Sequence, residues 1–249
     1  MSRRHLDRKD FKSQAKITLD GRAEGFFLPF GGIDLKLKLF ALLMILLLSL
    51  TGCGRDDSPE AALNEIKIAL AERDENKLCA RVDIDEFFSQ TYDAATVELA
   101  KNYDVYHAKY PDDPYFNHSA EFLTEYNAVH KERHLKFLDG VKESFFAKIP
   151  APEKPEENPT AYVSDEFEKI CAVTTATVKD TIVDGDRATV VVDVNGDNSL
   201  RGRFVGKLTF KLSFHRDAEK RWHFDEISNL DELTPVLVDK AELVWITFF

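Results

Sequence analysis

The chain has 249 residues, of which 44% are hydrophobic, and it carries 33 Lys and Arg against 44 Asp and Glu, a formal net charge of −11. Proteins that bind nucleic acid normally show a basic stripe or patch, so we expect no nucleic-acid partner for this acidic chain. Its length and apolar content are sufficient for one domain with a buried core.

Residues 1–35 are polar, mixed in charge and without a sustained amphipathic period. The segment is too long and too acidic for the positively charged region that begins an ordinary signal peptide. Our hypothesis is that translation starts near Ile33 to Lys36. Residues 1–35 are then either untranslated or a non-structured extension.

Residues 36–53 have the pattern of a signal peptide. Lys36 and Lys38 precede an apolar run of 12 residues, Leu39 to Leu50, that only Ser49 interrupts. A signal-peptide core has about 7–15 apolar residues, whereas a helix that crosses a bilayer needs about 20. The alternative is an uncleaved anchor helix, and both interpretations place the rest of the chain outside the cytoplasm.

The run ends on Leu50-Thr51-Gly52-Cys53, which resembles the lipobox of bacterial lipoproteins. The resemblance implies cleavage before Cys53 and lipidation of Cys53, which would then be the first mature residue. In Gram-negative bacteria an Asp directly after the lipidated cysteine retains a lipoprotein at the inner membrane. The residue here is Gly54, so the resemblance favours the outer membrane, facing the periplasm.

Lipid rather than surface charge would hold the mature chain to its membrane. The residues after Cys53 carry 24 Lys and Arg against 39 Asp and Glu, a net charge of −15, which anionic headgroups repel. Each buried methylene contributes about 0.8 kcal/mol, so two or three acyl chains anchor a protein stably. Residues 54–57 form a tether of roughly 15 Å, at no more than about 3.5 Å per residue.

The first half of the folded part, residues 58–149, has helical signals. Ser58-Pro59-Glu60 predicts a helix start, and Leu63, Ile66 and Leu70 mark its buried face as far as about Asp74 to Asn76. Asp83 is the predicted cap of a second helix that extends to about Tyr110. After a turn at 110–115, a third helix is predicted from about Ser119 to Lys148.

Pro150 to Pro159 contains four prolines in ten residues and predicts an exposed linker to the second half, residues 160–249. A short helix at 164–170 is followed by alternation of apolar and polar residues, which predicts four antiparallel strands. The hairpin turns between them are expected at Asp184-Gly185-Asp186, Asn195-Gly196-Asp197 and 216–220. The predicted strands are 174–183, 187–194, 203–215 and 221–228, and residues 233–249 are expected to add a strand or a short helix.

Helices followed by an antiparallel meander predict an α+β fold, with N-terminal helices packed on a curved sheet of four or more strands. The order is similar to that of the cone-shaped superfamily that includes ketosteroid isomerase and nuclear transport factor two, over roughly Ser58 to Leu230. The resemblance implies a pocket between the sheet and the helices.

Strand alternation suggests which polar side chains could line such a pocket. Asp180 shares a predicted face with Val178 and Ile182, and Glu226 shares one with Trp222 and Phe224. Burial would raise the pKa of either carboxyl group and let it act as a general acid or base. The alternative is that both carboxylates lie in water at the sheet rim, or that a bulge reverses the alternation; Tyr126 is a further pocket candidate.

His130 and His134 lie one helical turn apart, a spacing that can bind zinc. The segment is not His-Glu-x-x-His, because the glutamate is Glu132. A solvated polar helix face is the simpler interpretation, and we therefore predict no metal. In an oxidising compartment Cys79 and Cys171 can form a disulfide, and the alternative is two buried thiols.

The chain has no nucleophile elbow, no Gly-rich phosphate loop and no cysteine pair at metal spacing. We therefore expect no cofactor and favour a membrane-anchored lipoprotein of the cell envelope that serves as a non-catalytic binding or interaction module, whose partner would be an envelope protein or a small ligand. The alternative is a small-ligand carrier or an enzyme that uses the pocket, and a third interpretation is a structural envelope component. A core filled solidly by Phe, Val and Leu would favour the first or third.

Overall fold

A computed structural model describes residues 58–113 and 115–248 of the chain. The chain divides into Met1–Phe30 and Gly31–Phe249, and all described residues belong to the second unit. The predicted extension 1–35, the signal peptide 36–53 with Cys53, and the tether 54–57 lie outside the described residues.

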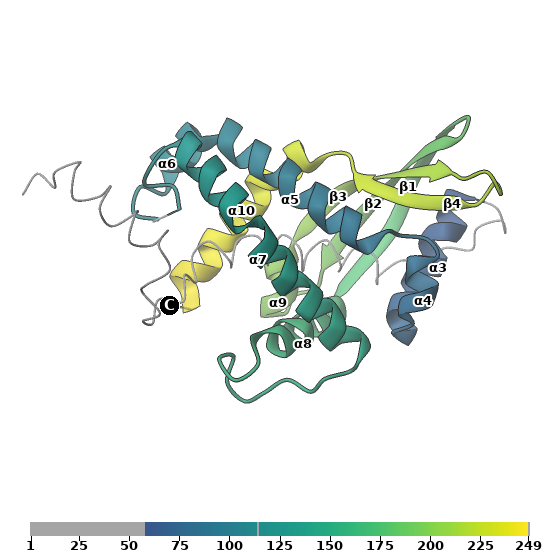
Figure 1. Cartoon of the computed structure of the whole chain (residues 1–249), viewed down its shortest axis with the longest axis horizontal. Coiled ribbons are helices and arrows are strands. Elements are labelled where there is room, and N and C mark those ends of the chain that lie inside the picture. The colour runs from purple at the N-terminus through teal and green to yellow at the C-terminus, as the bar shows by residue number, and fades with distance from the viewer. Residues whose placement is uncertain (1–57, 114, 249) are drawn as a thin grey trace, which may run out of the picture. The chain divides into compact units, whose positions relative to one another are not determined.

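The described part has an α+β fold, which confirms the prediction (Figure 1). Its four-stranded sheet is an antiparallel meander in the order β1-β2-β3-β4, with strands at Thr174–Asp184, Arg187–Gly196, Lys207–Arg216 and Trp222–Ile227. Eight helices accompany the sheet within these residues: α3 (Pro59–Glu72), α4 (Glu75–Cys79), α5 (Ile84–Lys101), α6 (Tyr103–Lys109), α7 (Ala120–Phe146), α8 (Pro159–Cys171), α9 (Leu200–Val205) and α10 (Leu230–Phe248).

Three predicted helix starts are confirmed by their caps. The side chains of Ser58, Asp83 and Ser119 accept hydrogen bonds from the backbone N–H groups of Ala61, Glu86 and Phe122, three residues further on in each case. Such a bond satisfies one of the N–H groups that the first turn of a helix leaves without a partner. Local sequence therefore determines where α3, α5 and α7 begin.

Several helix boundaries differ from the prediction. The second helix is two helices, because the backbone leaves helical geometry at Asn102 between α5 and α6. The short helix α4 was not predicted and is capped by Asp74. Helix α8 begins at Pro159, where Asn158 caps it and proline is tolerated because its missing N–H has no helical partner. The linker between α7 and α8 is therefore residues 147–158.

The first hairpin is confirmed. Asp184 pairs with Arg187, and Gly185 between them has a φ of +60°, a conformation that costs glycine little. The predicted hairpin at 195–197 is wrong, because helix α9 lies between β2 and β3 and the third strand begins at Lys207. Backbone hydrogen bonds from Gly196 to Gly206 and from Asp197 to Val173 hold this connection against the sheet.

The end of the chain is a 19-residue helix, α10, rather than a strand or a short helix. Asp231 and Glu232 occupy its first turn, where carboxylates stabilise the positive end of the helix dipole. Pro235 lies inside the helix.

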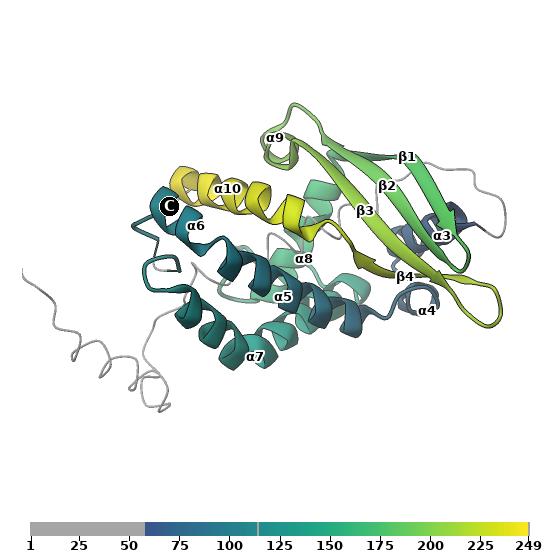
Figure 2. The same ribbon diagram turned by 90° about the horizontal axis from the view of Figure 1, so that it is seen from above.

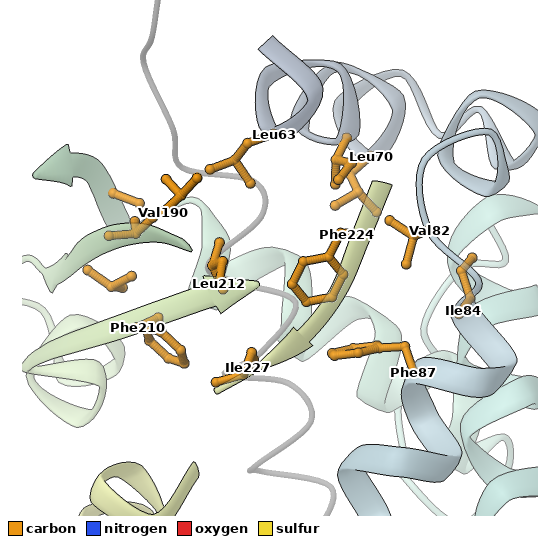
Figure 3. Close-up of a cluster of buried hydrophobic side chains, with 14 of the residues drawn as sticks. Leu63, Leu70, Val82, Ile84, Phe87, Val190, Phe210, Leu212, Phe224 and Ile227 are labelled. Atoms are coloured by element: carbon orange, nitrogen blue, oxygen red, sulfur yellow. The ribbon is translucent and has the colours of Figure 1, made fainter. Parts of the chain in front are cut away.

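One buried cluster joins the two halves of the folded part. Leu63 and Leu70 on α3, Phe87 on α5 and Phe224 on β4 point into the same space between sheet and helices (Figure 3). Helix α3 contacts β1, β2 and β4, α5 contacts β4, and α8 contacts β1. Helix α7 lies beside α5 in both ribbon views, and its contacts with α5 and α8 agree (Figure 2). A second cluster, which includes Phe116, Tyr106 and Val238, closes the space around α6 and α10.

Candidate functional site

Asp180 does not line the interior of the fold. In the pairing of β1 with β2, Val178 faces Val192 and Asp180 faces Val191, so Lys179 is an extra residue at a β-bulge. The bulge shifts the alternation by one residue and turns Thr181 inward in place of Asp180. Asp180 is exposed, and its carboxylate accepts a hydrogen bond from the backbone N–H of Thr181.

Glu226 is displaced in the same way on β4. Ser213 pairs with Glu226 while the next residue, Phe214, pairs with Phe224, which leaves Asp225 as the extra residue. Unbroken alternation after Trp222 and Phe224 would place Glu226 on the inward face. Ile227 is buried there instead, and Glu226 is exposed. The prediction that two carboxylates share the interior face is therefore wrong, and its stated alternative, a bulge that reverses the alternation, accounts for both residues.

Apolar side chains fill the inward face of the sheet. Val190, Val192 and Leu212 are 0% exposed, and Phe210 and Phe214 are 1% exposed. They belong to one cluster with the leucines and isoleucine on the inner side of α3. The interior side chains of the described sheet can therefore contribute packing, but no acid or base.

The third pocket candidate, Tyr126, lies on α7, away from the sheet. Its ring contacts that of His130, and the ring of His130 in turn contacts that of His134. The ring centroids of Tyr126 and His130 are 4.4 Å apart, and those of His130 and His134 are 6.0 Å apart. Residues four apart on a helix share a face, so the sequence spacing explains why the three rings adjoin. All three side chains are half-buried.

Helix α5 supplies a further member of this group. The hydroxyl of Tyr92 donates a hydrogen bond to the backbone carbonyl oxygen of Asn127 at 2.9 Å, and it lies 2.9 Å from Nδ1 of His134. Asn127 is itself 0% exposed. Its amide side chain makes two hydrogen bonds with the hydroxyl of Tyr115, at 2.8 and 3.0 Å. We call Tyr92, Tyr115, Tyr126, Asn127, His130 and His134 the imidazole–phenol cluster.

The phenols of the cluster stay protonated at neutral pH. Burial raises the pKa of Tyr92 and of Tyr115 far above the ordinary value of a phenol, and it also raises the pKa of Tyr126. A group whose pKa lies so high does not serve as a base at neutral pH. The bases of the cluster are therefore its imidazoles.

The hydrogen bonds determine which nitrogen of His134 carries a proton. A carbonyl oxygen only accepts, so the single hydroxyl proton of Tyr92 goes to Asn127. The contact between Tyr92 and Nδ1 of His134 then requires a proton on Nδ1. In neutral His134, Nε2 consequently holds the lone pair.

The sequence pattern indicated Tyr126, His130 and His134 as candidates but not the other three members of the cluster: Tyr92, Tyr115 and Asn127. The period of the second predicted helix placed Tyr92 among the apolar positions, and Tyr115 was assigned to a turn. An Asn on the buried side of a long helix was the available signal, because buried amides require hydrogen-bond partners.

A separate pair of histidines lies at the end of the β3–β4 hairpin. The rings of His215 and His223 stack with centroids 5.4 Å apart, and each contacts a carboxylate, Asp225 and Asp217 respectively. Burial raises the pKa of Asp217, but hydrogen bonds from Arg221 and His223 outweigh it and hold the pKa well below its usual range. These side chains form a hydrogen-bonded network at the sheet surface, which includes the ion pair of Arg221 with Asp217.

Of the two alternatives for Cys79 and Cys171, a disulfide or two thiols, the structure has the thiols. Cys79 and Cys171 are free thiols, on α4 and at the end of α8. Burial raises the pKa of both thiols, most strongly for Cys171. Because the thiolate is the reactive form, neither cysteine has the character of a nucleophile.

Within residues 58–113 and 115–248, no group of three or more His, Cys, Asp and Glu side chains is arranged to hold a metal ion. No helix in this part of the chain combines the length and the apolar composition that a membrane crossing requires. No protein-family model matches the chain, and searches of curated proteins and of solved structures find no significant match.

Proposed function

We propose that the chain is a lipid-anchored protein of the bacterial cell envelope whose folded part is a non-catalytic binding or interaction module. The support for the anchor is the order of Lys36, Lys38, a 12-residue apolar run and Leu50-Thr51-Gly52-Cys53. The first folded helix has its cap at Ser58, four residues after Gly54. A lipid on Cys53 would therefore keep the domain close to the membrane surface.

One observation carries the non-catalytic part of the proposal: apolar side chains fill the inward face of the sheet, and Asp180 and Glu226 lie outside it. An enzyme or small-ligand carrier that used this space would need a cavity with a few convergent polar groups. The carrier or enzyme alternative loses the residues on which it depended. An interaction through the outer surface is then the simpler function.

The anchor is tested by the variant Cys53→Ala in the full chain. We expect the wild type to be processed, to carry acyl chains by mass spectrometry of its N-terminal peptide, and to fractionate with membranes. Cys53→Ala should lose the acyl chains and remain unprocessed. Cys79→Ala is the matched control, because Cys79 is an exposed thiol on α4 that the proposal does not use.

Normal processing and full membrane residence of Cys53→Ala would contradict the lipoprotein assignment. The choice of membrane is tested separately by Gly54→Asp, which should move the protein from the outer to the inner membrane in a Gram-negative host. An unchanged distribution of Gly54→Asp between the two membranes would contradict the outer-membrane assignment.

A further inference from the structure

Two consecutive apolar side chains near the end of β1 are exposed. Ile182 is 58% exposed and Val183 is 54% exposed. Successive side chains of a strand point to opposite faces, so the pair presents apolar surface on both sides of the hairpin just before its turn. The other large hydrophobic side chains exposed in the described part, such as Val97 on α5, are isolated in the sequence. Apolar residues exposed singly are ordinary, so only this adjacent pair calls for a partner.

The pair lies beside the first turn of α3, which contacts β1. Thr181, the residue before Ile182, adjoins Glu60. Burial raises the pKa of the Glu60 carboxyl group, but contacts with the Thr181 side chain, its own backbone and Ser58 outweigh burial and lower it. Ser58 is the cap of α3 and directly follows the tether 54–57. Because the tether spans roughly 15 Å at most, a lipid on Cys53 would hold this end of the sheet close to the membrane.

The charge of this end of the sheet does not oppose contact with lipid. The β1–β2 and β3–β4 hairpins end at the same side of the sheet, where the backbone N–H of Arg216 donates to the carbonyl oxygen of Asp186 at 2.8 Å (Figure 2). Residues 179–187 and 215–223 carry as many basic as acidic side chains: Lys179, Arg187, Arg216, Lys220 and Arg221 against Asp180, Asp184, Asp186, Asp217 and Glu219. The excess negative charge that anionic headgroups repel therefore lies on other parts of the mature chain.

We propose that the end of the β1–β2 hairpin rests on the lipid surface of the membrane that holds Cys53, with Ile182 and Val183 in contact with the acyl chains. The proposal rests on the lipid anchor of the proposed function and adds an orientation of the folded part to it. Two apolar side chains are too few to hold a free acidic protein on a membrane. The anchor makes their contact intramolecular, so a small patch suffices.

This orientation determines which surface faces away from the membrane. Helix α6 lies at the opposite end of the folded part from α3 in both ribbon views (Figures 1 and 2). With the hairpin end on the lipid, α6 and the beginning of α7 point away from the membrane. That end is then open to a partner in the surrounding compartment.

The wild type provides the first test, as the acylated full chain in nanodiscs of phosphatidylethanolamine and phosphatidylglycerol. Isoleucine and valine methyl groups are labelled for NMR, and part of the lipid carries a paramagnetic group. Paramagnetic broadening falls steeply with distance, so the methyl groups of Ile182 and Val183 should broaden at least several-fold more than those of Val97 and Val129. Val97 and Val129, on α5 and α7, are 62% and 60% exposed, so exposure alone does not explain a difference.

Ile182→Asp tests the contact itself. A carboxylate at this position is repelled by anionic headgroups and is costly to remove from water. The broadening of the Val183 methyl groups should fall to the level seen at Val97, while acylation and fractionation with membranes remain as in the wild type. Val97→Asp is the matched control, because it adds the same charge at an equally exposed aliphatic position and should leave Val183 unchanged. Circular dichroism and thermal melting establish that both variants are folded.

Mass spectrometry of the N-terminal peptide separates this proposal from the anchor on which it rests. An acylated, membrane-bound wild type whose Ile182 and Val183 methyl groups broaden no more than those of Val97 would overturn the orientation and leave the anchor intact. A wild type without acyl chains would contradict the anchor and the orientation together. Unchanged broadening of Val183 in folded Ile182→Asp would also overturn the contact. If Ile182→Asp does not fold, the comparison within the wild type decides.

Discussion

The hydroxyl of Tyr92 on α5 lies 2.9 Å from Nδ1 of His134 on α7, and the same hydroxyl donates to the carbonyl oxygen of Asn127. The phenol of Tyr92 thus contacts a residue 42 positions further along the chain. Helices α5 and α7 also pack through apolar side chains, but apolar packing tolerates small rotations. The hydrogen bonds specify one rotation of α7 relative to α5.

Tyr92→Phe should therefore lower the free energy of unfolding by about 1–2 kcal/mol, because the Asn127 carbonyl and the His134 ring each lose their hydrogen bond to the phenol. Urea unfolding followed by circular dichroism measures the difference. Tyr162→Phe on α8 is the control and should stay within about 0.5 kcal/mol of the wild type. Equal stability of Tyr92→Phe and the wild type would show that the hydrogen bonds contribute nothing net.

Tyr103 and Tyr106, one turn apart on α6, should respond oppositely to the same substitution. The Tyr103 hydroxyl donates to the carbonyl oxygen of Phe116 at 2.6 Å and accepts from the N–H of His118 at 2.7 Å. The buried Tyr106 hydroxyl has no hydrogen-bond partner among the described residues. Tyr103→Phe should cost about 1–3 kcal/mol, whereas Tyr106→Phe should be neutral or stabilising, because it removes a buried polar atom without a partner.

Thermal and urea unfolding of the two variants provide the comparison, and each serves as the other's control for loss of a hydroxyl from a buried ring. A destabilisation of Tyr106→Phe as large as that of Tyr103→Phe would mean that the Tyr106 hydroxyl does have a partner.

Stability should fall at alkaline pH through the tyrosines. Burial raises the pKa of Tyr106 and, together with a hydrogen bond to Asp239, that of Tyr110 from 10.0 to about 12. The folded state therefore favours the neutral phenols and gains stability from them. This contribution to the free energy of unfolding is complete below pH 10 and is lost as the pH rises toward 12.

Absorbance at 295 nm reports phenol ionisation directly. The native chain should ionise part of its tyrosines at higher pH than the same chain in guanidinium chloride, and the midpoint of urea unfolding should decrease over the same interval. Superimposable titration curves in the native and unfolded states would contradict the raised pKa values.

A substitution in the sheet interior should lower the free energy of unfolding much more than a substitution of an exposed side chain of the sheet. Phe210 is 1% exposed within the main cluster, so Phe210→Ala should lower the free energy of unfolding by about 3–5 kcal/mol through the cavity that it leaves. Glu226 is exposed, and Glu226→Gln should change the free energy of unfolding by less than about 0.5 kcal/mol. Chemical denaturation measures both, and a loss above about 1 kcal/mol in Glu226→Gln would indicate that the carboxylate is buried.

The connection between β2 and β3 depends on Gly202, because the position has no room for a side chain. A Cβ at the buried Gly202 would overlap backbone atoms of Asp197, so Gly202→Ala should cost about 1–3 kcal/mol or more. The control is Gly185→Ala at the first hairpin, where no atom would obstruct a Cβ and only the positive φ opposes it, at about 1–2 kcal/mol. Gly185→Asn should recover part of that cost, because asparagine tolerates a left-handed backbone, and thermal melting compares the three. Wild-type stability of Gly202→Ala would mean that the connection rearranges freely.

The α+β class, the caps of α3, α5 and α7, the Asp184–Arg187 hairpin and the inward alternation of β2 and β3 followed from the sequence by itself. Each depends on residues within a few positions of one another, because caps and tight turns are closed by local hydrogen bonds and alternation follows from the geometry of a strand.

Only the tertiary structure decided the position of Asp180 and Glu226, the insertion of α9 and the assembly of the imidazole–phenol cluster. A bulge adds one residue where two strands pair, so Lys179 and Asp225 reverse the alternation without a signal in their own strands. The cluster likewise exists only because α5, α7 and the segment around Tyr115 pack together. Contacts between segments far apart in the chain depend on the free energy of the whole packed domain, and a pattern within one segment does not contain them.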